Sequence, residues 1–144
     1  EALKKFNENP KFRLELLSHS DDSLLKADAM VSDYSGIALS YAFGTGKPVL
    51  FIDVPRKIKN PKFEDLKIEP LELSLRSKIG ASLPPDKLSI APKIIKGLIS
   101  NTPEYSKKSF GLRDKYIYAF GSSSEVGAQH IMGIMGIKNE NKRQ

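Results

Sequence analysis

One short turn in the sequence combines residue types that can bind a phosphate group. The turn Asp33-Tyr34-Ser35-Gly36 follows an apolar run and precedes a stretch whose apolar residues recur at helical spacing. The first N–H groups of a helix lack partners within the helix, and the helix dipole adds partial positive charge there. A serine hydroxyl and a glycine let phosphate oxygens approach such a backbone closely. The same residues also suit a helix cap and a tight turn, and their spacing favours neither interpretation.

A second polar group follows the next apolar run along the chain. Asp53 ends the run 48–52, and Arg56 and Lys57 come soon after it. An arginine can bind phosphate through two parallel hydrogen bonds, and a lysine binds it as a point charge. Taken alone, these residues are better interpreted as a solvated charged loop. Their expected position beside the first turn strengthens the interpretation as a phosphate site.

Two further features could take part in a site. Ser122, Ser123 and Ser124 precede the last predicted helix, and capping by Ser123 or Ser124 is the first interpretation, with a second phosphate site as the alternative. His19 follows a predicted strand and could act as a general base. A lone histidine without a visible partner is, however, more often an incidental polar residue.

The pattern of apolar runs and turn signals predicts an α/β fold. Strands are predicted near 12–17, 29–33 and 48–52, with a helix in each connection. This β-α-β-α-β order with short connections is typical of a Rossmann-like parallel sheet flanked by helices. Right-handed crossovers place the ends of the second and third strands at one edge of the sheet, where such sheets bind ligands.

The second half of the chain is predicted to be mostly helical. A long basic loop is expected over 54–70, and residues 71–83 fit a strand or a helix equally, with Glu72 and Arg76 as an expected ion pair. Helices are predicted to begin at 84–86, 102–104 and 121–125. Residues 1–137 are therefore expected to form a single Rossmann-like domain, and residues 138–144 a frayed basic tail.

Composition narrows the classes of protein. The 144 residues, 40% hydrophobic and 28% charged, suit one soluble domain with its own core. The absence of cysteine excludes disulfides, thiolate zinc sites and a catalytic thiol, and the two histidines lack the spacing of metal ligands. A net charge of +6 suits an anionic ligand but is a weak signal for nucleic acid. Because the chain starts without methionine, we expect it to be a piece of a longer protein.

The stretch 27–51 resembles the C-terminal segment of the CDP-glycerol glycerophosphotransferases of teichoic-acid synthesis. Residues 27–36 (ADAMVSDYSG) are similar to that family's strand and its Asp-Tyr-Ser-Ser turn. Residues 41–43 (YAF) and 47–51 (KPVLF) are similar to the helix that follows and to the Lys-Pro start of the next strand. The resemblance covers residues 20–53 well and the rest of the chain only loosely.

This resemblance implies a GT-B-like enzyme whose C-terminal half binds a nucleotide-linked donor such as CDP-glycerol. In the family the Asp-Tyr-Ser-Ser turn lies at the donor phosphates, so Asp33, Tyr34 and Ser35 carry over, while Gly36 replaces the second serine. An N-terminal domain of the same protein would complete the site. The full-length enzyme would be cytoplasmic and associate peripherally with the membrane. The resemblance implies no cofactor.

The sequence departs from the family in two places. The catalytic histidines have no matching segment, and the loop 54–70 differs from that of the usual teichoic-acid members. We therefore expect a donor-binding domain that is inactive alone, with the general base elsewhere. A nucleotide-sugar glycosyltransferase or epimerase of the same architecture is one alternative. A non-catalytic receiver-like module is another, in which Asp33 and Asp53 would imitate part of a magnesium site. Nucleic-acid binding is a distant third alternative and is not expected.

Overall fold

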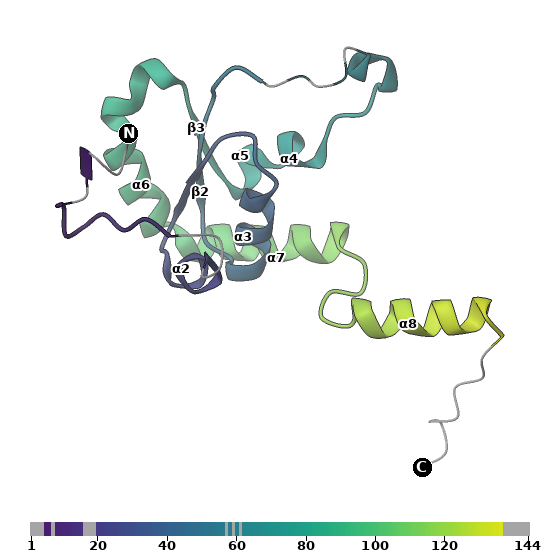
Figure 1. The fold of residues 1–144 in the computed structure, drawn as a ribbon. Coiled ribbons are helices and arrows are strands. Elements are labelled where there is room, and N and C mark those ends of the chain that lie inside the picture. Colours follow the sequence, from purple (N-terminus) through teal and green to yellow (C-terminus); the bar gives the residue numbers. More distant parts are fainter. Residues whose placement is uncertain are drawn as a thin grey trace.

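The computed structural model describes residues 5–6, 8–15, 20–56, 58, 60 and 62–136 of the chain. Its centre is a parallel sheet of three strands in the order β1 (Met30–Ser32), β2 (Val49–Ile52) and β3 (Gly80–Leu83) (Figure 1). Met30 pairs with Val49, and Val49 in turn pairs with Gly80. The expected α/β class and the parallel pairing of the strands near 29–33 and 48–52 are confirmed.

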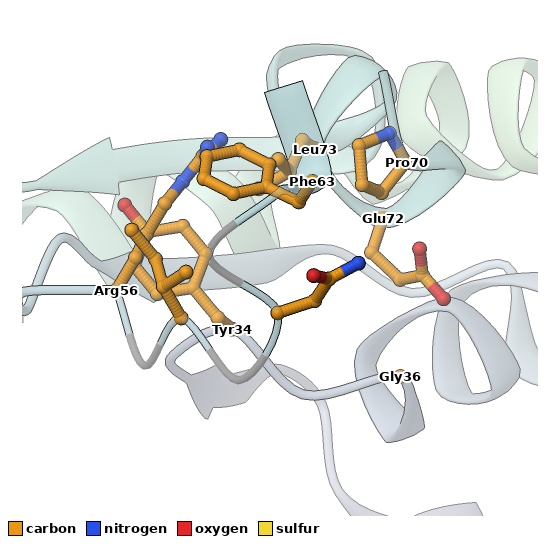
Figure 2. Close-up of a pocket in the computed structure, with 9 residues that line it drawn as sticks. Tyr34, Gly36, Arg56, Phe63, Pro70, Glu72 and Leu73 are labelled. Carbon is orange, nitrogen blue, oxygen red and sulfur yellow. The ribbon is translucent and has the colours of Figure 1, made fainter. Parts of the chain in front are cut away.

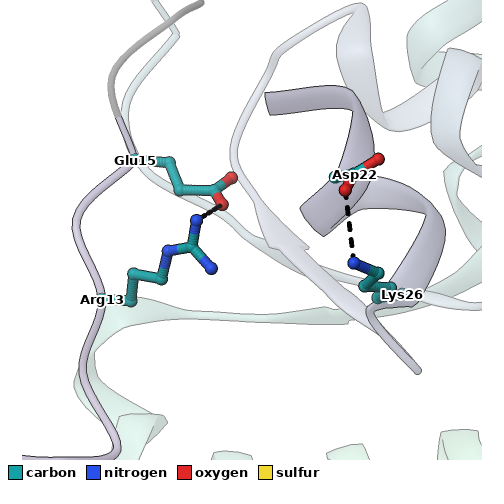
Figure 3. A network of polar contacts seen from close by, with 4 residues as sticks. All are labelled: Arg13, Glu15, Asp22 and Lys26. Atoms are coloured by element: carbon teal, nitrogen blue, oxygen red, sulfur yellow. Dashed lines mark hydrogen bonds and ion pairs between the residues drawn. The ribbon is translucent and has the colours of Figure 1, made fainter. Parts of the chain in front are cut away.

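The strand predicted near 12–17 is wrong for the residues that the structure describes there. Residues 12–15 are irregular, and 16–17 lie outside the described residues. The alternating apolar and charged residues make local contacts instead of sheet contacts: the ring of Phe12 lies 5.5 Å from that of Phe6, and Arg13 Nη2 lies 3.2 Å from Glu15 Oε1 (Figure 3). The third strand comes from the ambiguous stretch 71–83, as β3.

The central strand β2 is buried on both faces of the sheet. Val49 and Phe51 pack into one core cluster with α3 (Ile37–Thr45) and α5 (Arg76–Ile79), whereas Leu50 packs into another with α6 (Ala91–Ser100). Figure 1 shows α6 on one side of the sheet and α3 and α5 on the other. This double burial explains why the strand is a continuous apolar run and not an alternating one.

Gly80 allows the two strands to approach where β3 begins. A Cβ atom at this position would lie 1.7 Å from the carbonyl oxygen of Val49. No side chain larger than hydrogen fits there without moving the backbone of β2 or β3. The glycine therefore fixes the point at which β3 can join the sheet.

The remaining helices complete the described part of the chain. α7 (Thr102–Tyr116) packs against α3 and α5, and α8 (Ser123–Ile134) extends away from the body (Figure 1). The other elements are α2 (Ser20–Lys26), the 3-10 helix η2 (Phe63–Leu66), α4 (Leu71–Ser74) and the 3-10 helix η3 (Pro85–Ile90). Among the helices described, none has both the length and the apolar character needed to cross a membrane.

The end of α2 is fastened to the start of β2 through the backbone of Ala27. The hydroxyl of Tyr41 donates a hydrogen bond of 2.9 Å to the carbonyl oxygen of Ala27, and Lys47 Nζ donates one of 2.7 Å to the same oxygen. Lys47 Nζ also donates to the carbonyl oxygen of Leu25. Burial raises the pKa of Tyr41 to about 12. We call Tyr41, Lys47 and this carbonyl the Ala27 clasp.

Candidate functional site

Both predicted polar groups lie at the carboxyl edge of the sheet. β1 ends at Ser32 and β2 at Ile52, and the two strands are adjacent and parallel. The turn 33–36 and the segment 53–56 therefore leave neighbouring strand ends on the same side. This is the edge at which open α/β sheets bind their ligands.

A cavity of about 300 Å³ opens at this edge and draws its walls from both groups. Figure 2 shows Arg56 and Glu72 toward opposite ends of the cavity, with Tyr34 and Phe63 between them. Most of the wall is apolar, and the polar side chains are few. The cavity is lined by Tyr34, Gly36, Arg56, Ile58, Asn60, Phe63, Pro70, Glu72 and Leu73.

The ring of Tyr34 lies close to two guanidinium groups. The Cζ atom of Arg76 is 4.3 Å from the ring centroid, and that of Arg56 is 5.6 Å from it. Both distances are within the range of cation–π attraction, which strengthens when the cation is removed from water. Arg76 also lies 4.7 Å from the ring centroid of Phe51. The buried Arg76 thus makes the closer contact with the aromatic wall of the cavity, and the exposed Arg56 the longer one.

Arg76 makes a different ion pair from the one predicted. Its Nη2 atom lies 2.6 Å from Asp53 Oδ1, and the expected pair with Glu72 is not formed. The reason is local: α4 and α5 are separate helices that meet at Leu75, so Glu72 and Arg76 do not share one helical face. Arg76 is only 8% exposed, and its Nε and Nη2 groups have no aligned hydrogen-bond acceptor within the described residues. Asp53, engaged by Arg76, does not line the cavity.

The helix α3 begins at the cavity without a side-chain cap. Gly36 is its N-cap residue, and no acidic residue occupies its first turn. The nearest atom to an ideal Cβ on Gly36 is Glu72 Oε1, at 4.0 Å, so α4 supplies a carboxylate beside this helix end. The Ser35 carbonyl oxygen accepts a hydrogen bond of 3.2 Å from the Ala38 N–H. Ser35 thus takes part in the start of the helix through its backbone carbonyl and not through a capping hydrogen bond of its side chain.

The predicted phosphate-binding residues are only partly brought together. Tyr34, Gly36 and Arg56 line the cavity, whereas Asp33 and Ser35 stand beside it without lining it. The predictions for Lys57 and His19 lie outside the described residues. The segment expected as a long basic loop, 54–70, also contributes Asn60 and Phe63 to the cavity wall, and neither residue belongs to a motif that would have identified it. Glu72, on the neighbouring short helix, was also missed as a site residue.

The serines before α8 lie apart from this cavity. The prediction that Ser123 or Ser124 caps this helix is wrong: Ser122 is the N-cap residue, and no side-chain hydrogen bond caps the helix. The hydroxyl of Ser123 instead donates backwards to the carbonyl oxygens of Ala119, at 2.8 Å, and Tyr118, at 3.2 Å. These bonds stabilise the turn between α7 and α8.

Neither a cluster of metal ligands nor a similarity to known proteins marks this site. In the described part of the chain, no group of three or more His, Cys, Asp or Glu side chains could hold a metal ion. Comparisons of the chain with protein-family models, with curated proteins and with solved structures gave no match.

Proposed function

We propose that the cavity at the carboxyl edge binds the nucleotide-linked donor of a transferase similar to the CDP-glycerol glycerophosphotransferases. The observation that carries the proposal is that Tyr34, Gly36 and Arg56, from two neighbouring strand ends, line one cavity of about 300 Å³. Ligand sites are typically concave and mostly apolar, with a few polar groups that fix orientation. This cavity has that composition.

The chemistry of the walls suits a nucleotide with a linked polyol. Arg56 is exposed and can form charge-assisted hydrogen bonds with a diphosphate. The Tyr34 and Phe63 rings offer apolar surface to a base, and Asn60 offers an amide with both donors and acceptors. The base and the diphosphate of such a donor thus each meet a matching group in the cavity.

The proposed reaction is the attack of an acceptor hydroxyl on the glycerol-bearing phosphorus of the donor. The new oxygen–phosphorus bond replaces the bond to the second phosphate, and CMP leaves with the electron pair of that bond. Arg56 would stabilise the charge that develops on the leaving phosphate. Among the described residues that line the cavity there is no histidine, and we assign proton removal to another part of the enzyme.

The wider setting belongs to the same proposal. This chain would be the donor-binding half of a GT-B-like enzyme, with an N-terminal half facing the cavity. The full-length enzyme would work at the cytoplasmic face of the membrane. The receiver-like alternative is weakened because the Asp53 carboxylate pairs with the buried guanidinium of Arg76 and is not free to join a magnesium site.

The test is a titration of the isotope-labelled chain with CDP, CMP and UDP, followed by NMR. We expect CDP to shift the resonances of Tyr34, which lines the cavity beside Arg56. Arg56→Gln should weaken CDP binding about tenfold or more, because a hydrogen bond to a charged group contributes roughly 1.5–3 kcal/mol. Lys96→Gln removes the same charge from α6, on the other side of the sheet, and should leave binding unchanged.

The outcomes separate the alternatives. Equal binding of CDP and UDP would favour a nucleotide-sugar enzyme of the same architecture. If the Tyr34 resonances stay still while others shift, or if Arg56→Gln behaves like Lys96→Gln, the cavity is not the donor site. Magnesium-dependent shifts of Asp33 and Asp53 without any nucleotide effect would instead support the receiver-like module.

A further inference from the structure

The Glu72 side chain stands between two cavities. Together with Gly36 it lines the cavity of about 300 Å³ and also a second cavity of about 430 Å³, which lies over α3 beneath Ile117 and Phe120. Glu72 is exposed to solvent, and the carboxylate is the nearest described group to the position of a Gly36 Cβ atom, at 4.0 Å. Any ligand that reaches the start of α3 from either side meets this carboxylate.

The candidate donor site therefore carries opposite charges toward its two ends. Arg56 lies toward one end and Glu72, beside Gly36, toward the other (Figure 2). A phosphate group is attracted to the guanidinium and repelled by the carboxylate, and both act within a Debye length in a cavity of this size. A carboxylate can only accept hydrogen bonds, so its natural partner on a ligand is a hydroxyl or an amine.

We propose that Glu72 determines specificity at this site by excluding phosphate from the start of α3 and accepting a hydrogen bond from a donor hydroxyl. The donor then lies with its phosphates toward Arg56 and its hydroxyl-bearing group toward Glu72. This proposal rests on the proposed function and refines it. It also replaces the expectation that the phosphates lie on the Ser35 and Gly36 backbone amides.

A purely structural role for Glu72 makes a different prediction. A carboxylate beside a helix N-terminus stabilises the helix through the macrodipole, and this effect changes the unfolding free energy without choosing between ligands. The distinguishing quantity is therefore the ratio of two affinities, for a ligand with phosphates only and for one with phosphates and hydroxyls. A structural role would leave this ratio unchanged.

The experiment compares Glu72→Gln with Glu125→Gln by calorimetry, using pyrophosphate and CDP-glycerol as probes. Both variants lose one negative charge, but Glu125, an exposed residue of α8, lines neither cavity. We expect Glu72→Gln to bind pyrophosphate about three- to tenfold more tightly than Glu125→Gln. We expect its preference for CDP-glycerol over pyrophosphate to fall about tenfold or more, since a hydrogen bond to a charged group is lost.

Two further measurements make the result decisive. In Glu72→Gln alone, pyrophosphate should shift the Gly36 amide resonance. Glu72→Asp keeps the charge, so pyrophosphate should leave the Gly36 amide resonance unshifted in this variant, as in the unchanged chain. If Glu72→Gln and Glu125→Gln show the same affinities, the role of Glu72 is refuted while the donor site stands, provided that CDP-glycerol binds and that Arg56→Gln weakens this binding. If CDP-glycerol does not bind the unchanged chain, the proposed function and this refinement both fail.

Discussion

The Ala27 clasp and the rim of the cavity differ in what holds their residues. Tyr41 and Lys47 of the clasp make hydrogen bonds of 2.9 and 2.7 Å to one carbonyl oxygen, and Tyr41 is buried. Of the rim residues that come from the two strand ends, Tyr34 is half-buried, and Gly36 and Arg56 are exposed. The first region is determined by contacts within the chain, whereas the second presents groups to the cavity.

This difference divides the family resemblance into two parts. Tyr41 and Lys47 belong to the similar stretches 41–43 and 47–51, and the fold alone accounts for both, because each fastens α2 to the rest of the domain. Of the stretches in the proposed resemblance, only the turn 33–36 contributes residues to the cavity. The functional proposal therefore depends on far fewer residues than the whole resemblance contains.

The largest effect on stability is expected from Gly80→Ala, which tests how rigidly β2 and β3 are held together in the sheet. The new Cβ would lie 1.7 Å from the Val49 carbonyl oxygen, so β3 must move away from β2. We expect a loss of more than about 3 kcal/mol in urea unfolding. Gly97→Ala, on α6 with no atom near its Cβ, should instead stabilise the chain by about 0.5–1 kcal/mol. Similar effects of the two changes would show that the sheet tolerates displacement.

The next effect tests the clasp itself. Lys47→Met keeps the aliphatic stem but removes the hydrogen bonds to the carbonyl oxygens of Ala27 and Leu25. We expect the unfolding free energy to fall by about 2 kcal/mol, measured by urea denaturation. Lys26→Met serves as the control, because its ion pair with Asp22 is fully exposed and should contribute less than about 0.5 kcal/mol (Figure 3). If Lys47→Met lowers the unfolding free energy no more than Lys26→Met does, the Ala27 clasp does not stabilise the chain more than an exposed ion pair.

Tyr41 gives the clasp a pH dependence. Its pKa is about 12 in the folded chain against about 10 when unfolded, so the folded state keeps the phenol proton to higher pH. This stability is fully present below pH 10 and is lost as the pH rises through 12. Between pH 9 and pH 11 the unchanged chain should lose about 1 kcal/mol more than Tyr41→Phe. Equal losses in the two chains would mean that Tyr41 is not held as a neutral donor.

The smallest effect on stability is expected at the rim. Arg56 is exposed, and its only described interaction is a long cation–π contact of 5.6 Å with Tyr34. Arg56→Gln should change the unfolding free energy by less than about 0.5 kcal/mol while weakening CDP binding about tenfold. A large loss of unfolding free energy would show that Arg56 stabilises the fold, and the basis for its role in binding would be lost.

Sequence patterns predicted the parts of the fold that depend on local signals. The parallel pair β1–β2, the helix α3 and the start of α7 at Thr102-Pro103 follow from apolar runs, a glycine stop and a proline at the first turn. The third strand, β3, could not be predicted in this way, because its residues Gly80–Leu83 form no apolar run and its place is set by contact with β2. The segment 12–15 shows the reverse error, because its residues alternate like those of a strand but form none.

The candidate site was predictable only where it follows the strand ends. Tyr34, Gly36 and Arg56 could be placed because parallel strands bring their carboxyl ends together. Glu72 and the buried Arg76 could not, because their positions depend on the break between α4 and α5 at Leu75. No periodicity in the stretch 71–79 indicates this break, and without it the two residues look like an ordinary helical ion pair.

The central position of β2 also has a consequence for how the chain folds. Both of its neighbours are parallel, so each pairing must wait until a crossover has closed, one from Met30 to Val49 and one from Val49 to Gly80. Loop-closure entropy grows only with the logarithm of length, so the longer crossover costs about 0.4 kcal/mol more. The two pairings therefore have similar entropic costs, and neither is strongly favoured to form first. Until both form, the run Val49–Ile52 is exposed along an unpaired edge, and this makes it the segment most prone to aggregate during folding.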